Sequence, residues 1–183
     1  NVFYCLGNHD FLSKKFRKGG IMQGWVFRDA LQARYGKEMI KVYEKFIASS
    51  PLMFIGQGIV ANHAGPIDDQ YPLACLKKSG IAAEEDAPFV EQCLWRRWKH
   101  YNAFLSYDEE DVKKFLMNVI GQPEAVYLVG HSPSLLYYDE YRINAFTARL
   151  MPRHYMVFNG YDNGGCARFI NGADPETIEF IEA

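Results

Sequence analysis

The chain of 183 residues is long enough for a substantial core, and we treat residues 1–183 as a single domain. Its 49% hydrophobic and 15% aromatic content excludes a disordered chain, and its net charge of −2 argues against a general affinity for nucleic acid. No apolar run reaches about 18 residues, so we expect no membrane span. The four cysteines form no CxxC pair, which argues against structural zinc and indicates reduced thiols in a cytoplasmic protein, with a disulfide as the alternative.

The predicted elements start with a short buried strand. Val2 to Leu6 form an apolar run that ends at Gly7, where we expect the backbone to turn sharply. The basic stretch from Lys14 to Lys18 favours a solvated loop, with a positive rim that attracts anionic substrates as the alternative. Helical spacing of apolar residues predicts helices over Gln23–Tyr35 and Lys37–Ala48. The first carries one apolar stripe of Met22, Val26, Ala30 and Ala33.

A β-hairpin is predicted in the middle of the chain. Leu52–Ile55 and Ile59–Asn62 are apolar runs joined by a Gly-Gln-Gly turn. A polar, turn-rich segment reaches Pro88 and includes a short helix near Leu73–Lys78. The stretch Phe89–Trp98 is expected to be helical in part.

The last third is predicted to hold one helix followed by strands. Ser106 and Glu109 match a capping box that opens a helix, and Gly121 with Pro123 would close it. Apolar runs then predict four strands: Ala125–Val129, Tyr155–Phe158, Ala167–Ile170 and Thr177–Ile181.

Potential metal ligands recur where predicted strands end. Asn8 follows the first strand, His63 follows the second strand of the hairpin, and His131 follows Ala125–Val129. Neighbouring strands lie about 5 Å apart, so these side chains can converge on one point. Two imidazoles and an amide oxygen suit Mn, Fe or Zn better than Mg or Ca. The alternative is two core histidines and a turn asparagine.

Four short motifs stand in an order that resembles a known family. They are GNHD at Gly7–Asp10, NHAGP at Asn62–Pro66, LWRR at Leu94–Arg97 and GHSP at Gly130–Pro133. The chain resembles the calcineurin-like metallophosphoesterases, and most closely their phosphoprotein phosphatase branch. The family's D-x-H and G-D-x-x-D-R motifs are absent. We expect them upstream of Asn1, so that the resemblance covers the C-terminal part of the family's domain.

The resemblance implies an α/β fold, a sandwich of mixed β-sheets flanked by helices, without the family's first strands. It implies two divalent transition metal ions, with Mn favoured over Fe or Zn. One of them would be bound by Asn8, His63 and His131.

The resemblance also assigns the reacting groups. His9 would be the general acid, and Asp10 would hold its imidazole, although a turn cap is the alternative for Asp10. Arg97 would bind the phosphate, with Arg96 in its place if the register shifts by one. A surface salt bridge is the alternative for Arg97, and Trp95 is expected to serve packing.

The implied function is hydrolysis of phosphate monoesters, on a phosphoprotein or a small phosphorylated substrate, with no nucleic acid and no membrane as partner. Serine or threonine phosphoproteins are favoured, and tyrosine is a further option. A dinucleoside tetraphosphatase or other nucleotide phosphohydrolase is the nearer alternative, and a non-catalytic binding module with a degenerate metal site is the farther one. Without the upstream motifs we expect residues 1–183 to be nearly inactive.

His100 and His154 are expected to be structural or solvated, and Tyr137, Tyr138 and Tyr141 to line a groove, a rim or the core.

Overall fold

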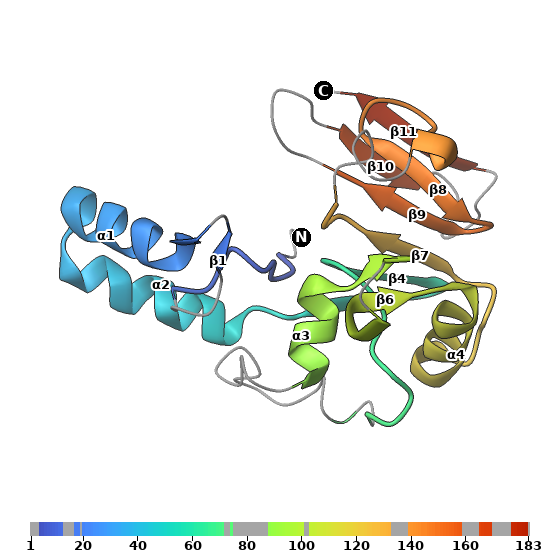
Figure 1. Ribbon diagram of the computed structural model, residues 1–183, viewed down its shortest axis with the longest axis horizontal. Coiled ribbons are helices and arrows are strands. Elements are labelled where there is room, and N and C mark those ends of the chain that lie inside the picture. The colour runs from blue at the N-terminus through green and yellow to red at the C-terminus, as the bar shows by residue number, and fades with distance from the viewer. Residues whose placement is uncertain are drawn as a thin grey trace.

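A computed structural model of the chain describes residues 4–12, 17–18, 20–71, 74, 88–100, 103–132, 139–158, 165–169 and 177–182. Its centre is a mixed five-stranded sheet with the order β3-β4-β7-β9-β8. The strands are β3 (Met53–Gly56), β4 (Ile59–Asn62), β7 (Val126–Val129), β8 (Thr147–Met151) and β9 (His154–Val157). The three central strands run parallel, and β3 and β8 pair antiparallel at the two edges. The expected α/β class is therefore confirmed (Figure 1).

Two helices complete the core beside this sheet (Figure 1). They are α3 (Pro88–Trp95) and α4 (Glu109–Ile120). Each helix buries four apolar residues in the same cluster as sheet residues such as Val60 and Tyr127. The helical residues are Phe89, Val90, Cys93 and Leu94 of α3 and Val112, Phe115, Leu116 and Val119 of α4. A short parallel pair, β5 (Arg97–Trp98) and β6 (Ser106–Tyr107), connects the two helices.

The start of α4 corrects the predicted capping box. Asp108, rather than Ser106, is the N-cap, and its carboxylate accepts from the backbone of Glu110 at 2.9 Å and Asp111 at 3.3 Å. The Asp111 carboxylate accepts from the Asp108 N–H in return. Ser106 lies in β6, where its backbone is extended, so it cannot start the helix. Gly121 closes α4 at a φ of 69°, as predicted.

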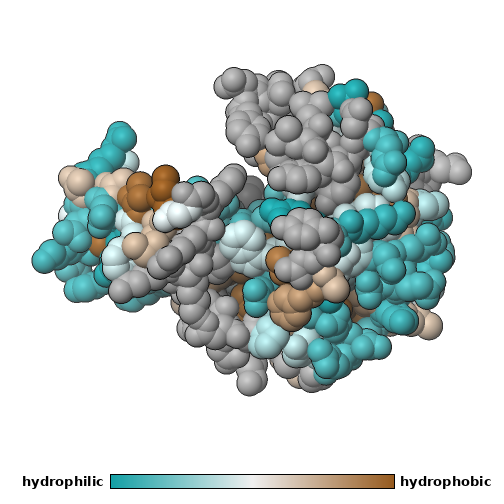
Figure 2. All heavy atoms as spheres, viewed as in Figure 1, coloured by the Kyte–Doolittle hydropathy of each residue, from teal (hydrophilic) through white to brown (hydrophobic). Residues whose placement is uncertain are grey.

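The two predicted helices near the start of the chain form an arm rather than part of the core. They are α1 (Gln23–Tyr35) and α2 (Lys37–Ser49), preceded by the short strands β1 (Arg17–Lys18) and β2 (Ile21–Met22). Figure 1 shows them as a hairpin that extends away from the sheet. Val26 of the predicted stripe is 59% exposed, and Gly24 is the buried residue of α1. Helical spacing located α1 correctly, but the predicted stripe is not a buried face, because Val26, Ala30 and Ala33 are all exposed. Figure 2 shows hydrophobic side chains on the arm's surface.

The predicted first strand is not found in residues 4–7, whereas the two predicted strands near the end of the chain are. Residues 4–7 are irregular and are joined to the segment before β3 by the bond from Leu6 N to Pro51 O at 3.0 Å, whereas Val2 and Phe3 lie outside the described residues. The strands β10 (Gly165–Phe169) and β11 (Ile178–Glu182) form an antiparallel hairpin close to their predicted positions. This hairpin contacts β9 through the rings of Tyr155 and Phe180, 5.1 Å apart.

The remaining expectations concern a membrane span, the cysteines and segments outside the described residues. No helix in the described ranges has the length and apolar character needed to cross a bilayer. Cys5, Cys93 and Cys166 are free thiols. Three other predictions lie outside the described residues: the helix near Leu73–Lys78, the start of the basic stretch at Lys14, and the placement of Tyr137 and Tyr138.

The imidazole of His154 is fully buried in the core on β9. Its Nδ1 lies 3.1 Å from the carbonyl oxygen of Tyr127, and its Nε2 lies 3.1 Å from the hydroxyl of Tyr107. Because a carbonyl only accepts, Nδ1 carries the proton and Nε2 accepts from Tyr107. Burial lowers the pKa of His154 to about 4, so the ring is neutral near pH 7. This environment agrees with the prediction that His154 is structural.

We expect His154 to make the fold sensitive to acid. Between pH 6.5 and about 4 the unfolded chain binds a proton at His154 that the folded chain does not, so stability falls as the pH drops through this window. The contribution is complete above the window and changes the free energy of unfolding by about 1.4 kcal/mol per pH unit within it. Urea denaturation at a series of pH values should show a shallower dependence for His154→Gln. Parallel curves for the two proteins would contradict this account.

Candidate metal centre

His63 and His131 are brought together by the parallel pairing of β4 with β7. The backbone N–H of Gly130 donates to the carbonyl oxygen of His63 at 2.8 Å, which extends the pairing beyond both strand ends. The two imidazole centroids are 4.9 Å apart, and His131 Nδ1 lies 3.0 Å from His63 Nε2. The two histidines that follow strand ends therefore meet at one sheet edge, as the sequence predicted.

Asn8 reaches the same point from the irregular segment at the start of the chain. Its side-chain Oδ1 lies 2.8 Å from His63 Nε2, and the residue is 1% exposed. Its Nδ2 is buried and has no hydrogen-bond partner among the residues that the structure describes. Three potential donor atoms, from Asn8, His63 and His131, thus gather around one position.

This donor set fits a divalent transition metal ion. Two donors each about 2.1 Å from a metal and at right angles to one another lie about 3 Å apart, which matches the 2.8 Å and 3.0 Å between the donor atoms here. Hydrogen bonding accounts for the cluster less well, because a single proton on His63 Nε2 cannot serve both contacts in good geometry. Within the described ranges, no three His, Cys, Asp or Glu side chains form a metal-binding group, so the amide of Asn8 is needed to complete this one.

The protonation state of His63 suits a metal ligand. Burial, with a smaller contribution from the nearby His9, lowers the pKa of His63 to about 4. The imidazole is therefore neutral near pH 7, and a ring nitrogen lone pair is available for coordination.

Gly7 leaves the space that the His63 ring occupies. A Cβ at this position would lie 3.1 Å from both Cε1 and Nδ1 of His63. Gly7 does not have a positive φ, so the predicted sharp turn is not the reason for a glycine here. The reason is the close approach of the imidazole to the backbone.

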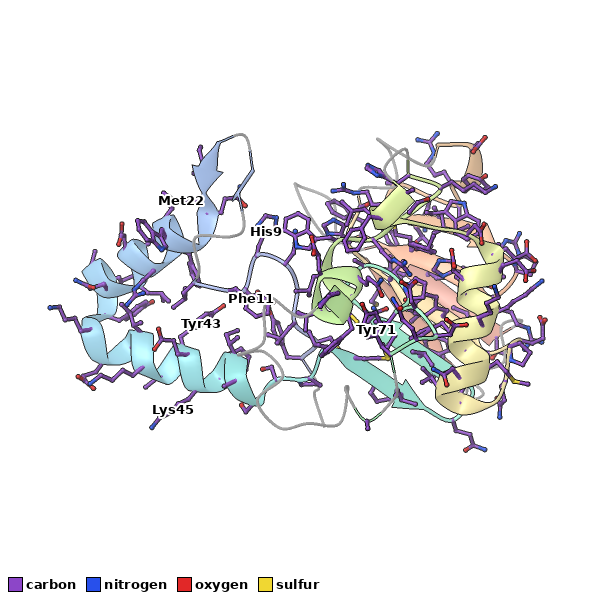
Figure 3. All side chains as sticks on the ribbon, turned by 60° about the horizontal axis from the view of Figure 1, so that its bottom comes forward. His9, Phe11, Met22, Tyr43, Lys45 and Tyr71 are labelled. Atoms are coloured by element: carbon purple, nitrogen blue, oxygen red, sulfur yellow. The ribbon has the colours of Figure 1, made fainter. Side chains whose placement is uncertain are left out.

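His9 projects from the segment between the helical arm and the sheet (Figure 3). Its imidazole is exposed and meets the indole of Trp95 edge to face, with centroids 6.4 Å apart. Trp95 also contacts His131 edge to face at 5.6 Å. The indole of Trp95 thus connects the candidate general acid with a candidate ligand, a placement that the sequence prediction of simple packing missed.

Asp10 closes the turn that presents Asn8 and His9. Its Oδ2 accepts from the Gly7 N–H at 2.6 Å, and it also bonds the Tyr4 hydroxyl, whose pKa is raised by burial and by this carboxylate. The Tyr43 hydroxyl of α2 donates to the Asp10 carbonyl oxygen at 2.9 Å, which ties the arm to this turn. Asp10 therefore caps the turn that precedes it, whereas the turn-cap alternative concerned the turn that follows it. Its predicted effect on His9 stays a prediction.

The structure distinguishes the two candidate phosphate-binding arginines. Arg96 is buried, with Nη1 donating to the Pro66 carbonyl oxygen at 3.0 Å and Nη2 donating to Asp68. Asp68 is itself bonded to Gln92, so the charge of Arg96 is compensated inside the protein. Arg97 is half-buried, and its Nε donates to Ser132 Oγ at 3.2 Å, next to His131.

Sequence reasoning missed Ser132, Asp68 and Gln92. Ser132 belonged to the GHSP motif but had no assigned role, and its partly buried bond to Arg97 depends on two segments far apart in the chain. Asp68 and Gln92 were ordinary polar residues in a loop and a helix. The sequence pointed to Asp68 and Gln92 only through their closeness along the chain to the Asn62–Pro66 and Leu94–Arg97 motifs.

Comparison with known protein families and with curated proteins found no match. No model of a known protein family matches the chain, and no curated protein matches it in sequence. The family resemblance therefore depends on the four motifs alone.

We expect Gly7→Ala to weaken metal binding because the new methyl group would displace the His63 ring by a few tenths of an ångström. A displacement of that size exceeds the tolerance of a metal site, and a loss of affinity of about 10-fold is expected. Mn²⁺ titration calorimetry measures the effect. Gly121→Ala is the control, because it strains a helix end with open space around it and should lower stability without changing the affinity. Equal Mn²⁺ affinity for Gly7→Ala and wild type would contradict the argument.

Proposed function

We propose that this chain is a metal-dependent phosphatase that hydrolyses phosphate monoesters. The observation that carries the proposal is the convergence of three potential ligand atoms: His63 Nε2 lies 2.8 Å from Asn8 Oδ1 and 3.0 Å from His131 Nδ1. An exposed imidazole, His9, and an arginine, Arg97, stand beside this cluster through their contacts with Trp95 and Ser132. We further propose membership of the calcineurin-like metallophosphoesterases, in the phosphoprotein phosphatase branch, with that family's sandwich fold.

Asn8, His63 and His131 would hold one of two divalent ions, because imidazole and amide oxygen are accepted ligands of transition metal ions. The family resemblance favours Mn²⁺ over Fe or Zn. When bound, such ions supply Lewis acidity toward the phosphoryl group and lower the pKa of water.

The protein's own side chains would bind the phosphate and protonate the leaving group. The guanidinium of Arg97 can bond two phosphate oxygens at once and compensate their charge. As water attacks phosphorus and the ester P–O bond breaks, His9 would donate its proton to the departing alkoxide oxygen. Trp95 would limit the positions open to the His9 ring through their edge-to-face contact.

A serine or threonine phosphoprotein is the favoured substrate, with phosphotyrosine as an option. The exposure of His9 supports this choice, because a protein-borne leaving group can reach a donor that lies at the surface. A nucleotide phosphohydrolase is the alternative, and turnover of phosphopeptides against dinucleoside polyphosphates by the full-length protein would separate the two. A non-catalytic module would bind Mn²⁺ and turn over neither.

We expect His63→Ala and His131→Ala each to lower the amount of bound Mn²⁺ in a folded protein. Each change removes one of three neighbouring donors, and the two that remain cannot complete the set. Elemental analysis after gel filtration measures the metal, and circular dichroism checks the fold. His100→Ala is a control histidine outside the cluster. Unchanged metal content in both variants would exclude the site.

We expect His9→Asn to retain bound metal but to reduce turnover by about 10²–10⁴, the usual contribution of a general acid. The loss should be smaller for aryl phosphates than for alkyl phosphates, since a good leaving group needs less protonation. Steady-state kinetics of the full-length protein with both substrate types measures this. Equal losses for the two types would count against proton donation by His9.

A further inference from the structure

Arg97 is held by a residue on the loop that carries His131. Its Nε donates to Ser132 Oγ at 3.2 Å, and Ser132 is 3% exposed. A serine hydroxyl can accept this bond, and an arginine can only donate it. The bond joins β5 to the carboxyl end of β7, two segments that are 35 residues apart in the chain.

The position of Ser132 is set by the same sheet edge as the candidate ligands. Ser132 directly follows His131, and the preceding Gly130 is bonded through its N–H to the His63 carbonyl oxygen at 2.8 Å. The backbone that orients both imidazoles therefore also orients the hydroxyl that meets Arg97. The bond to Ser132 thereby restricts the orientation of the guanidinium relative to His63 and His131.

Arg97 bonds Ser132 through Nε and not through a terminal nitrogen, which matters for anion binding. A guanidinium is planar, so a bond at Nε restricts the orientation of the whole group. The two terminal nitrogens at the far end form a fork that matches two phosphate oxygens, and the bond to Ser132 does not use them. An arginine ordered before the anion arrives loses less rotamer freedom on binding, which corresponds to an affinity gain of about 2- to 12-fold.

We propose that Ser132 is a positioning residue that orients Arg97 toward the phosphate group, an inference that rests on the proposed function. Ser132 does not touch the substrate in this account. It acts only through Arg97, and its loss should therefore have no effect once Arg97 is removed.

The test measures the binding of inorganic phosphate to the Mn²⁺-loaded protein by titration calorimetry. We expect Ser132→Ala to weaken binding about 2- to 12-fold, and Ser132→Thr, which keeps the hydroxyl, to restore it. Ser132→Cys, close in size but a poor acceptor, should behave like Ser132→Ala and serves if the alanine variant does not fold. Ser50→Ala is a matched control, since it also removes a buried hydroxyl with one hydrogen bond, at the end of α2.

A double-mutant cycle with Arg97→Met separates positioning from a general structural role. Arg97→Met alone should weaken phosphate binding more than Ser132→Ala, and adding Ser132→Ala to it should cause no further loss. Bound Mn²⁺ should be equal in Ser132→Ala and wild type.

Two outcomes would overturn the inference and leave the proposed function intact. In the first, Ser132→Ala and Ser132→Cys bind phosphate as tightly as wild type while Arg97→Met binds it more weakly. In the second, adding Ser132→Ala to Arg97→Met lowers the phosphate affinity further. Wild-type affinity in Arg97→Met would instead remove the phosphate-binding role of Arg97 from the proposed function, and the role of Ser132 with it.

Discussion

The parallel pairing of β4 with β7 is the constraint on which the candidate site depends. Ala61 lies opposite Leu128, and the two chains then continue into His63 and His131. A register slip of one residue would turn one imidazole to the other face of the sheet, because side chains alternate along a strand. The bond between Gly130 and His63 continues the pairing at the point where the ligand-type side chains begin.

A buried network of hydrogen bonds stabilises the carboxyl ends of β4 and β7, where His63 and His131 lie. The Tyr127 hydroxyl of β7 donates to Asn62 Oδ1 at 2.6 Å, and Asn62 Nδ2 donates to the Gly65 carbonyl oxygen at 2.6 Å. The turn that carries His63 is thus fixed to the neighbouring strand through side chains as well as backbone. Ala64 N also donates to the Cys93 carbonyl oxygen at 2.8 Å, which joins the turn to α3, the helix that ends at Trp95. Buried groups that are fully bonded in this way hold one conformation, which a metal site requires.

The sequence predicted what depends on local pattern. Periodicity located α1 and α2 and the strands of the sheet centre. The ends of predicted strands pointed to Asn8, His63 and His131, which lie together in the structure although no strand precedes Asn8 in the described residues. It missed β8, whose Thr-Ala-Arg-Leu-Met sequence does not alternate cleanly and whose pairing has an irregularity between Arg149 and Met151.

Features that depend on distant segments could not be read from the sequence. Arg96 and Arg97 are neighbours with the same chemistry, and only the contacts with Asp68 and Ser132 distinguish them. In the same way, the strand pattern of Val2–Leu6 did not show whether a neighbour would pair with it, and residues 4–7 are irregular.

The central claim is that Asn8, His63 and His131 bind one metal ion. Diffraction data collected at the manganese absorption edge from crystals grown with Mn²⁺ test this most directly, because anomalous scattering locates the ion independently of the protein atoms. The account predicts an anomalous peak about 2.0–2.3 Å from Asn8 Oδ1, His63 Nε2 and His131 Nδ1. A well-ordered cluster without such a peak, or a peak bound only by other residues, would contradict it.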